Sequence, residues 1–486
     1  MFLGCLSVAV SAAEKPNVVF FLVDDLGQRD LSCYGSTFYE TPNVDRLAKE
    51  GALFTNGYAA CPVCSPSRAA VQTGRWPQRT GITDYIGAPL KPEGWKRNTI
   101  LLPAPYSDRL AHEEVTMAEM LKGAGYATFF AGKWHLGMEG WYPEDQGYDI
   151  NMGGIEKGGP YGPGKYFTPY ANPRLPDGPP GEHLPDRLAT ETCRFIEVNK
   201  AKPFFAFFSF YDVHTPLQAR PDLLAKYEAK RKKLGLEPKF GREEPRDVRL
   251  VQEHAVYAAM VEAMDLAVGK VLAKLDELGL AKDTLVIFTS DNGGLSTSEG
   301  SPTSNLPLRG GKGWLYEGGI RDAAIIRWPA MVKGGAVIDT PVCHVDYLPT
   351  ILAATQAKSS TKLDGVSLLP LFQGKALPER ALAWHYPHYG NQGGAPGAAV
   401  RRGDWKLILW FERPDAPELY NLRDDLSETK NLAPQEPERV KAMLAELQAW
   451  QKDVGAVMPT QNPAYDASKP NGRSASGPAK ATKKKK

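Results

Sequence analysis

Cysteine is scarce in this chain, with 6 among 486 residues, and no group of histidines and cysteines has the spacing of a zinc site. Cysteines this sparse do not form the disulfide framework of a small secreted domain, and their pairing cannot be read from the sequence. No internal repeat is present. Beyond the first residues no run of about 18 apolar residues occurs, so no membrane span is expected.

A basic surplus is also missing once the end of the chain is set apart. The formal net charge is +2, but the last 21 residues contribute +6, which leaves −4 for the rest. The body of the chain therefore offers no basic surface, and a nucleic-acid partner is not expected. Residues 459–486 form a Ser-, Ala-, Pro- and Lys-rich tail that we expect to be disordered.

A short apolar stretch opens the chain. Residues 1–13 contain the small-residue sequence Val10-Ser11-Ala12 near their end, as in a secretory signal peptide with its cleavage site. The usual positive region before the apolar part is missing, which leaves open whether the true start lies upstream. We expect an exported protein, located in the periplasm, at the cell surface or in the medium.

Apolar runs of strand length alternate with helical patterns over most of the chain. The runs are Pro16–Val23, Tyr126–Ala131, Pro203–Tyr211, Thr284–Ser290 and Ala323–Trp328. Strands that are apolar throughout are typical of a sheet covered on both faces, and their alternation with helices predicts an α/β domain with a mostly parallel sheet over residues 14–370. Residues 371–458 instead predict a small antiparallel sheet with one helix, Pro437–Asp453.

Polar residues follow directly after four of these strands. Asp24-Asp25 and Asp291-Asn292 together supply three carboxylates and an amide oxygen, and ligands bind at this edge of open α/β sheets. Hard oxygen ligands of this kind suit Ca²⁺, with Mg²⁺ as the alternative. Taken singly, each pair could instead cap a helix or close a turn, and the metal site could be purely structural.

Cationic and imidazole side chains occupy the other strand ends and one glycine-rich loop. Lys133 and His135 lie two residues apart and so project to the same side of an extended segment. His214 follows its strand, and Arg309 and Lys312 flank two glycines that allow close approach to a ligand. Each alone could be a solvated surface residue. Together they predict an anion pocket that faces a divalent cation.

The segment Cys64-Ser65-Pro66-Ser67-Arg68 reads as a nucleophile loop that opens a helix. Pro66 and Ser67 suit the first helical positions, and the N–H groups of a helix N-terminus favour an anion. A cysteine there, close to Arg68, is expected to have its thiol tuned toward the charged form. The alternative is a buried free cysteine beside a surface arginine.

With the following Thr73-Gly74-Arg75, this loop resembles the signature of type I sulfatases, in which the cysteine is oxidised to Cα-formylglycine by a formylglycine-generating enzyme. Further segments are similar to motifs of the same family, and the resemblance covers most of the chain. These segments are Val23–Gly27, Gly132–His135, His214–Pro216, Asp291–Gly293, and Lys312 followed by Glu317–Arg321. The segment Gly147–Gly159 departs from the family, because it lacks the hydroxyl residue that many relatives place there.

The resemblance implies an alkaline phosphatase-like fold and a sulfuric ester hydrolase. It implies that calcium is held by Asp24, Asp25, Asp291, Asn292 and the modified Cys64. The hydrated formylglycine is then the nucleophile, Arg68 fixes it, Lys133 and Lys312 bind sulfate oxygens, His135 takes a proton to expel sulfate, and His214 serves the leaving alcohol. Rivals are a phosphoester or phosphonate monoester hydrolase on the same scaffold and a non-catalytic sulfated-glycan binding protein.

The substrate is expected to be a sulfated carbohydrate or an aryl sulfate, chosen by the long loops. The segment Trp384–Tyr389 is rich in aromatic residues and histidine. It could form a platform on which a sugar stacks, with His385 and His388 contacting hydroxyls. The alternative is an ordinary aromatic edge of the core.

Overall fold

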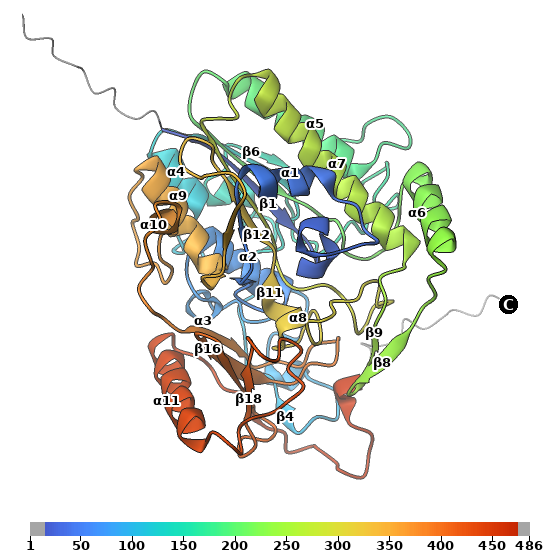
Figure 1. Ribbon diagram of the computed structural model, residues 1–486, viewed down its shortest axis with the longest axis vertical. Helices are drawn as coiled ribbons and strands as arrows, with labels where there is room; N and C mark the ends of the chain where they lie inside the picture. Colours follow the sequence, from blue (N-terminus) through green and yellow to red (C-terminus); the bar gives the residue numbers. More distant parts are fainter. Residues whose placement is uncertain (1–14, 475–486) are drawn as a thin grey trace, which may run out of the picture.

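The computed structural model describes residues 15–474, and its centre is an eight-stranded sheet between two layers of helices (Figure 1). The predicted signal peptide, 1–13, lies outside the described residues. In spatial order the strands are β13 (Ala336–Ile338), β2 (Ala52–Phe54), β12 (Ala324–Arg327), β10 (Thr284–Ser290), β1 (Asn17–Val23), β7 (Phe204–Ser209), β5 (Ala127–Gly132) and β6 (Ile150–Met152).

The central strands β10, β1, β7, β5 and β6 run parallel, whereas β12 is antiparallel to both of its neighbours. The expected α/β fold with a large, mostly parallel mixed sheet is therefore confirmed. Because the central strands are parallel, their carboxyl ends lie at one edge of the sheet. Side chains that follow these strands are brought together there.

Strand β1 shows why its apolar run is continuous. Val19, Phe21 and Val23 pack into one core, while the alternate residues Phe20 and Leu22 pack into the other. Burying a side chain such as Phe20 stabilises the fold by about 1.5–3 kcal/mol relative to leaving it exposed. The first core is covered by α1 (Pro42–Glu50), α5 (Leu184–Asn199), α6 (Pro221–Leu234) and α7 (Ala255–Glu277), and the second by α2 (Cys64–Thr73), α4 (Met117–Gly123) and α9 (Tyr347–Thr355).

Helix α2 begins two residues earlier than the position of Pro66 suggests. Its first residue is Cys64 and its N-cap is Val63, so Pro66 occupies the third helical position rather than the first. A proline is tolerated there because the N–H groups of the first turn have no partner within the helix. The helix ends at Gly74, whose φ of 63° lies in the left-handed region.

The C-terminal unit is an antiparallel sheet of four strands with one helix, as predicted. Its strands are β15 (Leu382–Tyr386), β16 (Gly397–Arg402), β17 (Trp405–Trp410) and β18 (Glu418–Asn421), and its helix is α11 (Pro437–Asp453). One face of the sheet packs on Met443 and Leu447 of α11. The other face packs on the main unit, where Trp384 lies against Tyr58 with ring centroids 5.2 Å apart.

The tail is ordered over part of its length. Strand β19 (Thr460–Gln461) pairs with β4 (Leu101–Leu102), and the Gly472 N–H donates to Asn98 O at 2.8 Å. The prediction of disorder is thus wrong for 459–474, because the backbone near residue 100 offers partners that composition does not reveal. The remainder of the Lys-rich tail lies outside the described residues.

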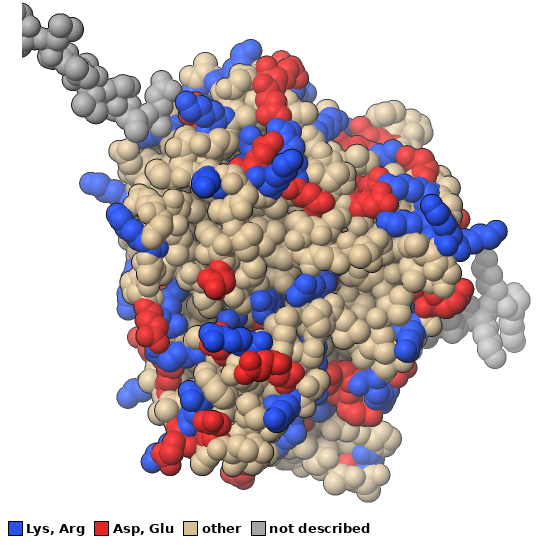
Figure 2. All heavy atoms as spheres, in the orientation of Figure 1, with Lys and Arg blue, Asp and Glu red and all other residues tan. Residues whose placement is uncertain are grey.

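Short elements complete the fold. They are α3 (Pro77–Thr80), α8 (Glu317–Ile320) and α10 (Leu369–Phe372), the small sheet of β11 (Arg321–Asp322), β3 (Gly57–Tyr58) and β14 (Val342–Cys343), and the hairpin of β8 (Phe240–Glu243) and β9 (Arg246–Arg249). Within 15–474 no helix has the length and apolar character needed to cross a membrane. Basic and acidic side chains are intermixed over the face shown in Figure 2.

Candidate active site

Four parallel strands deliver the polar residues that follow them to one place. The Asp24 N–H donates to Asp212 O at 2.8 Å, and the Asp291 N–H donates to Val23 O at 3.0 Å. The Lys133 N–H likewise donates to Ser209 O at 2.9 Å. Backbone pairing therefore continues past the strand ends and fixes the relative positions of these segments.

Each of the three buried carboxylates has its own cation. Asp24 Oδ2 lies 2.7 Å from Lys133 Nζ, and Asp25 Oδ2 lies 2.7 Å from Lys312 Nζ. Asp291 Oδ2 accepts from Arg68 Nε at 2.8 Å and lies 2.7 Å from the terminal Nη2 of the same guanidinium. The cluster is therefore close to neutral as it stands, and an added divalent cation would make it attractive to an anion.

The carboxylates differ in how well their charge is compensated. Burial raises the pKa of Asp24 well above its ordinary value, since Lys133 does not outweigh burial and the neighbouring Asp291 and Asp25. Burial also acts to raise the pKa of Asp25, but Lys312 and His214 prevail and hold it below its usual range. Asp24 is thus the carboxylate with most to gain from a further cation.

Two oxygen atoms are suited to such a cation. Asp24 Oδ1 and Asn292 Oδ1 are buried and have no hydrogen-bond partner. One oxygen each of Asp24 and Asp25 and one ring nitrogen of His214 lie within 4.8 Å of one another. Buried acceptors without donors are unfavourable unless something binds them. The residues present therefore fit a hard divalent ion better than they fit an apo core.

Cys64 stands at the first turn of α2 with its thiol beside an imidazole. Its Sγ lies 3.5 Å from His135 Nδ1. Burial raises the pKa of the Cys64 thiol, and the nearby Lys133 and Lys312 do not overcome it. The expectation of a thiol tuned toward its charged form is therefore wrong, because the side chain is only 3% exposed and Arg68 is engaged by Asp291. As a thiol, residue 64 is poorly suited to be the nucleophile.

The tautomer of His135 follows from its partners. His135 Nε2 lies 2.8 Å from Ile86 O, and a carbonyl oxygen can only accept, so this nitrogen carries the proton. The free electron pair of Nδ1 then faces Cys64 Sγ and Ser65 Oγ, the latter at 3.2 Å. Burial, helped by Lys133, keeps the pKa of His135 well below its ordinary value. His135 is therefore a neutral base aimed at residue 64.

Two site residues hold backbone conformations that non-glycine residues seldom adopt. Asp25 has φ of 61° and His135 has φ of 58°. Strain of this kind collects at functional sites, where the surroundings enforce it. Gly158 makes room for the imidazole, because a Cβ added there would lie 2.8 Å from His135 Cε1.

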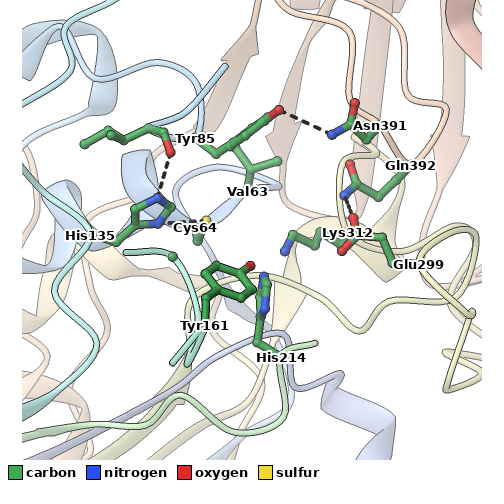
Figure 3. Close-up of a pocket in the computed structure, with 12 residues that line it drawn as sticks. Val63, Cys64, Tyr85, His135, Tyr161, His214, Glu299, Lys312, Asn391 and Gln392 are labelled. Atoms are coloured by element: carbon green, nitrogen blue, oxygen red, sulfur yellow. Dashed lines mark hydrogen bonds between the residues drawn. The ribbon is translucent and has the colours of Figure 1, made fainter. Parts of the chain in front are cut away.

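A cavity of about 290 Å³ opens above this cluster (Figure 3). His135 and Cys64 lie on one side of it, and Lys312, Glu299 and Gln392 on the other. The lining residues are Val63, Cys64, Tyr85, Ile86, His135, Gly158, Tyr161, His214, Glu299, Lys312, Asn391 and Gln392. The base, the lysine and residue 64 thus share one chamber with aromatic and amide side chains.

The residues expected to form the site fall into three groups. Cys64, His135, His214 and Lys312 line the cavity. Lying behind them, fully or almost fully buried, are Asp24, Asp25, Arg68, Lys133, Asp291 and Asn292. The third group, the residues expected to contact substrate, does not line the cavity. It consists of Arg309, His385 and His388.

Each member of that third group is occupied by protein partners. Arg309 forms two hydrogen bonds to Glu243, both at 2.8 Å, and its guanidinium lies 3.8 Å from the ring centroid of Tyr316. His385 is buried between Gln451 and Val457 O, at 3.0 Å from each. The sugar-platform interpretation of Trp384–Tyr389 is not supported by this placement, because Trp384 and Tyr386 pack into the core between the two units and Tyr389 stacks on Trp95.

His388 is also buried, with its Nε2 2.9 Å from Thr83 Oγ1. Instead, the loop that follows it reaches the cavity through Asn391 and Gln392. Sequence reasoning missed these residues along with Ser65, Tyr85, Tyr161 and Glu299. Only Ser65 carried a signal, its position next to Cys64; the others lie on loops without a motif.

Comparison with known proteins agrees with this geometry. Residues 16–357 match the sulfatase family, and residues 311–453 match the family described as N-sulphoglucosamine sulphohydrolase, C-terminal. A sulfatase of Formosa agariphila is 32% identical over 90% of this chain and 89% of its own. The steryl-sulfatase of Homo sapiens is 31% identical over 77% of this chain and 73% of its own. A solved structure titled Ps i-CgsB in complex with k-i-k-neocarrahexaose has a TM-score of 0.73 and 27% identity, covering 94% of this chain and 96% of that one.

Proposed function

The chain belongs to the sulfatase family of the alkaline phosphatase superfamily and is a sulfuric ester hydrolase, and we propose that it releases sulfate from a carbohydrate by means of a formylglycine made from Cys64. The observation that carries the proposal is the pairing of Cys64 with a neutral His135 in one cavity. The buried, protonated thiol is a poor nucleophile. Conversion of Cys64 to hydrated formylglycine would place a hydroxyl next to His135, which could then accept its proton.

The hydrated formylglycine would supply two hydroxyls, one to attack sulfur and one whose deprotonation expels sulfate. Both oxygens would be bonded to Cβ of residue 64, and the Sγ that one of them replaces lies 3.5 Å from His135 Nδ1. His135 Nδ1 would accept the proton, since its Nε2 already donates to Ile86 O. Its low pKa keeps it unprotonated and ready at neutral pH.

His214 faces the same cavity in a different state. Its Nδ1 donates to Thr215 O at 2.6 Å, so the Nε2 of the neutral ring can only accept. Burial and the charge of Lys312 lower the pKa of His214 to about 3. We therefore assign His214 Nε2 as an acceptor in the free protein. It can donate a proton to the leaving alcohol only after it has itself accepted one. Lys312, whose pKa stays well above its ordinary value despite burial because Asp25 is adjacent, donates to the ester oxygens.

A divalent cation, Ca²⁺ with Mg²⁺ as the alternative, would be held by Asp24, Asp25, Asp291 and Asn292 together with residue 64. It would supply charge that offsets the sulfate oxygens and lowers the pKa of the attacking hydroxyl. The unpartnered Asp24 Oδ1 and Asn292 Oδ1 support this assignment. Arg68 orients Asp291 through two guanidinium nitrogens, and it also donates to Ser209 Oγ at 2.8 Å.

A carbohydrate substrate is supported by the walls of the cavity. Tyr85, Tyr161, Asn391 and Gln392 offer ring faces and amide groups, which suit a hydroxylated ring better than an apolar one. A match to the family of N-sulphoglucosamine sulphohydrolase C-termini points the same way, as does a relative whose title names an oligosaccharide ligand. We further propose export of the protein and maturation by a formylglycine-generating enzyme.

The test is intact-peptide mass spectrometry across residue 64, combined with sulfate release from defined sulfated saccharides. We expect conversion of the thiol to the aldehyde, which removes SH₂ and adds O. Active protein with an unmodified thiol would refute the formylglycine mechanism. Cys64→Ala should abolish sulfate release while leaving the thermal unfolding transition in place. Phosphate and phosphonate esters and a steryl sulfate in the same panel decide the substrate class.

A further inference from the structure

Glu299 is the one carboxylate among the residues that line the cavity, and it stands on the side opposite His135 (Figure 3). Nothing in the sulfate chemistry described above uses it. A negative charge beside a pocket that binds an anionic ester is unfavourable unless it serves recognition. Its position is therefore informative about the part of the substrate that is not sulfate.

The carboxylate is held in place. Glu299 Oε1 accepts from Gln392 Nε2 at 2.8 Å, and Oε2 lies 3.4 Å from Thr215 Oγ1. Gln392 is itself only 5% exposed, and its backbone O accepts from Trp314 Nε1 at 3.1 Å and from Thr297 Oγ1 at 3.0 Å. The wall that carries Glu299 is thus prearranged, and each oxygen keeps capacity to accept a further hydrogen bond.

Within residues 15–474, Glu299 forms no ion pair at contact distance, although the charge of Lys312 acts on it across the cavity. Lys312 faces the same cavity but gives its short contact to Asp25, at 2.7 Å. Over residues 15–474, no lysine, arginine or histidine forms an ion pair with Glu299. The remaining polar groups of that wall, Asn391 and Gln392, are neutral. A ligand that fills the cavity therefore meets a carboxylate that is hydrogen-bonded to neutral groups but has no ion-pair partner among the described residues.

We propose that Glu299 is a specificity residue: it accepts hydrogen bonds from hydroxyls next to the hydrolysed ester and excludes substrates with a second anionic group at that place. This rests on the proposed sulfatase function and narrows it. The preferred substrate is a sugar whose sulfate has hydroxyl neighbours rather than a carboxylate or another sulfate. Glu299 is exposed at the rim of the cavity, and a carboxylate there accepts well from hydroxyl donors and repels a like charge that approaches it.

A pair of small probes tests the charge preference directly. They are 4-(hydroxymethyl)phenyl sulfate and 4-carboxyphenyl sulfate, which have similar shape and differ in one negative charge. The kcat/KM of each is measured with converted wild-type protein and with Glu299→Gln, at low and high salt. We expect the wild-type protein to prefer the neutral probe. Glu299→Gln should shrink that preference by about tenfold, with a smaller change at high salt, as for a close like-charge contact.

The matched control is Glu237→Gln, which removes the same charge at a side chain that is 83% exposed and does not line the cavity. It should leave the ratio of the two kcat/KM values unchanged. An equal ratio in wild type and Glu299→Gln would overturn the proposal, provided that both proteins unfold at the same temperature. Failure of wild-type protein with converted residue 64 to hydrolyse either probe or any sulfated saccharide would instead count against the proposed function.

Discussion

Ser65 Oγ lies 3.2 Å from His135 Nδ1, the nitrogen that also faces Cys64 Sγ. The same hydroxyl accepts the Ile86 N–H at 3.0 Å, while Ile86 O accepts from the other ring nitrogen of His135. Ser65 and Ile86, which are bonded to each other, thus hold the imidazole at its two nitrogens. Ser65 is a positioning residue, because it acts on residue 64 through His135.

Ser65→Ala should lower kcat by about 10–100-fold with little change in KM, since a mispositioned base affects the chemical step more than binding. Mass spectrometry across residue 64 has to show equal conversion in both proteins. Ser67→Ala is the matched control, because Ser67 Oγ bonds to Cys61 and not to His135. If Ser65→Ala changes only KM, or if both variants lose kcat equally, the positioning role is wrong.

Calcium removal should reduce both activity and stability. A ligand that binds only the folded state stabilises it by about 2.7 kcal/mol at a concentration of one hundred times its Kd. Thermal unfolding of protein stripped with EGTA and titrated with Ca²⁺ or Mg²⁺ measures this. Asp24→Asn should remove the response, whereas Asp247→Asn, at a side chain that is 71% exposed, should keep it. An unchanged calcium response in Asp24→Asn would show that the ion binds elsewhere.

Lys406, which does not line the cavity, should matter for stability. It is fully buried, and its Nζ lies 2.9 Å from both Glu317 Oε1 and Glu428 Oε1. Lys406→Met removes the cation between two buried carboxylates and leaves Glu428 without an ion-pair partner, while Glu317 keeps Arg321 at 3.1 Å; we expect a cost of about 3–5 kcal/mol. Lys441→Met, at an exposed position of α11, should change stability by less than about 0.5 kcal/mol. Urea unfolding measures the free energy of unfolding of both variants. Equal losses in the two variants would contradict a stabilising role for buried Lys406.

Asp265 should give stability a pH dependence of definite sign. It receives the Asn43 and Val44 N–H groups at the start of α1, at 3.0 and 2.8 Å, and burial raises its pKa to about 6. An unfolded aspartate titrates near pH 4. Between about pH 4 and pH 6 the folded protein retains a proton that the unfolded chain has lost, so the contribution of Asp265 to stability falls as pH rises, by up to about 3 kcal/mol.

Urea unfolding of the wild type and of Asp265→Asn at several pH values between 4 and 7.5 measures this slope. The free energy of unfolding of the wild type should fall relative to that of Asp265→Asn between about pH 4 and pH 6. The difference should then stay constant above the folded pKa. Parallel curves would mean that Asp265 does not titrate there. Asp276→Asn, on the same helix with a side chain that is 40% exposed, is the control.

The sequence predicts the sheet well because its signal is local. The continuous apolar run before Asp24 and the one before Asp291 mark strands with two covered faces, and polarity changes where each strand ends. Convergence of those ends follows from parallel pairing alone. The side of the cavity that carries Glu299 and Gln392 has no local sequence signal. These residues reach the cavity on loops whose course depends on distant contacts, such as the hydrogen bond from Trp314 Nε1 to Gln392 O.

The expectations that the structure does not support share one cause. His385 and Arg309 look like exposed functional groups in the sequence, yet each has a buried or paired partner supplied by a segment far away. Cys64 is a similar case, because burial, rather than the adjacent Arg68, determines the direction of its pKa shift. The sequence pattern indicates where a strand ends, but it does not indicate which distant residues pack around a side chain.

The described part of the tail reaches the loop that carries Gln392. Arg473 donates to Gly393 O at 2.9 Å, next to Gln392, and Arg97 donates to Gly472 O at 2.7 Å. Arg246 also holds this loop, through a hydrogen bond from its Nη2 to Asn391 O at 2.7 Å. The loop that carries Gln392 is therefore braced by a segment that follows α11 in the sequence, and we expect a chain shortened to residue 458 to hold this side of the cavity less firmly.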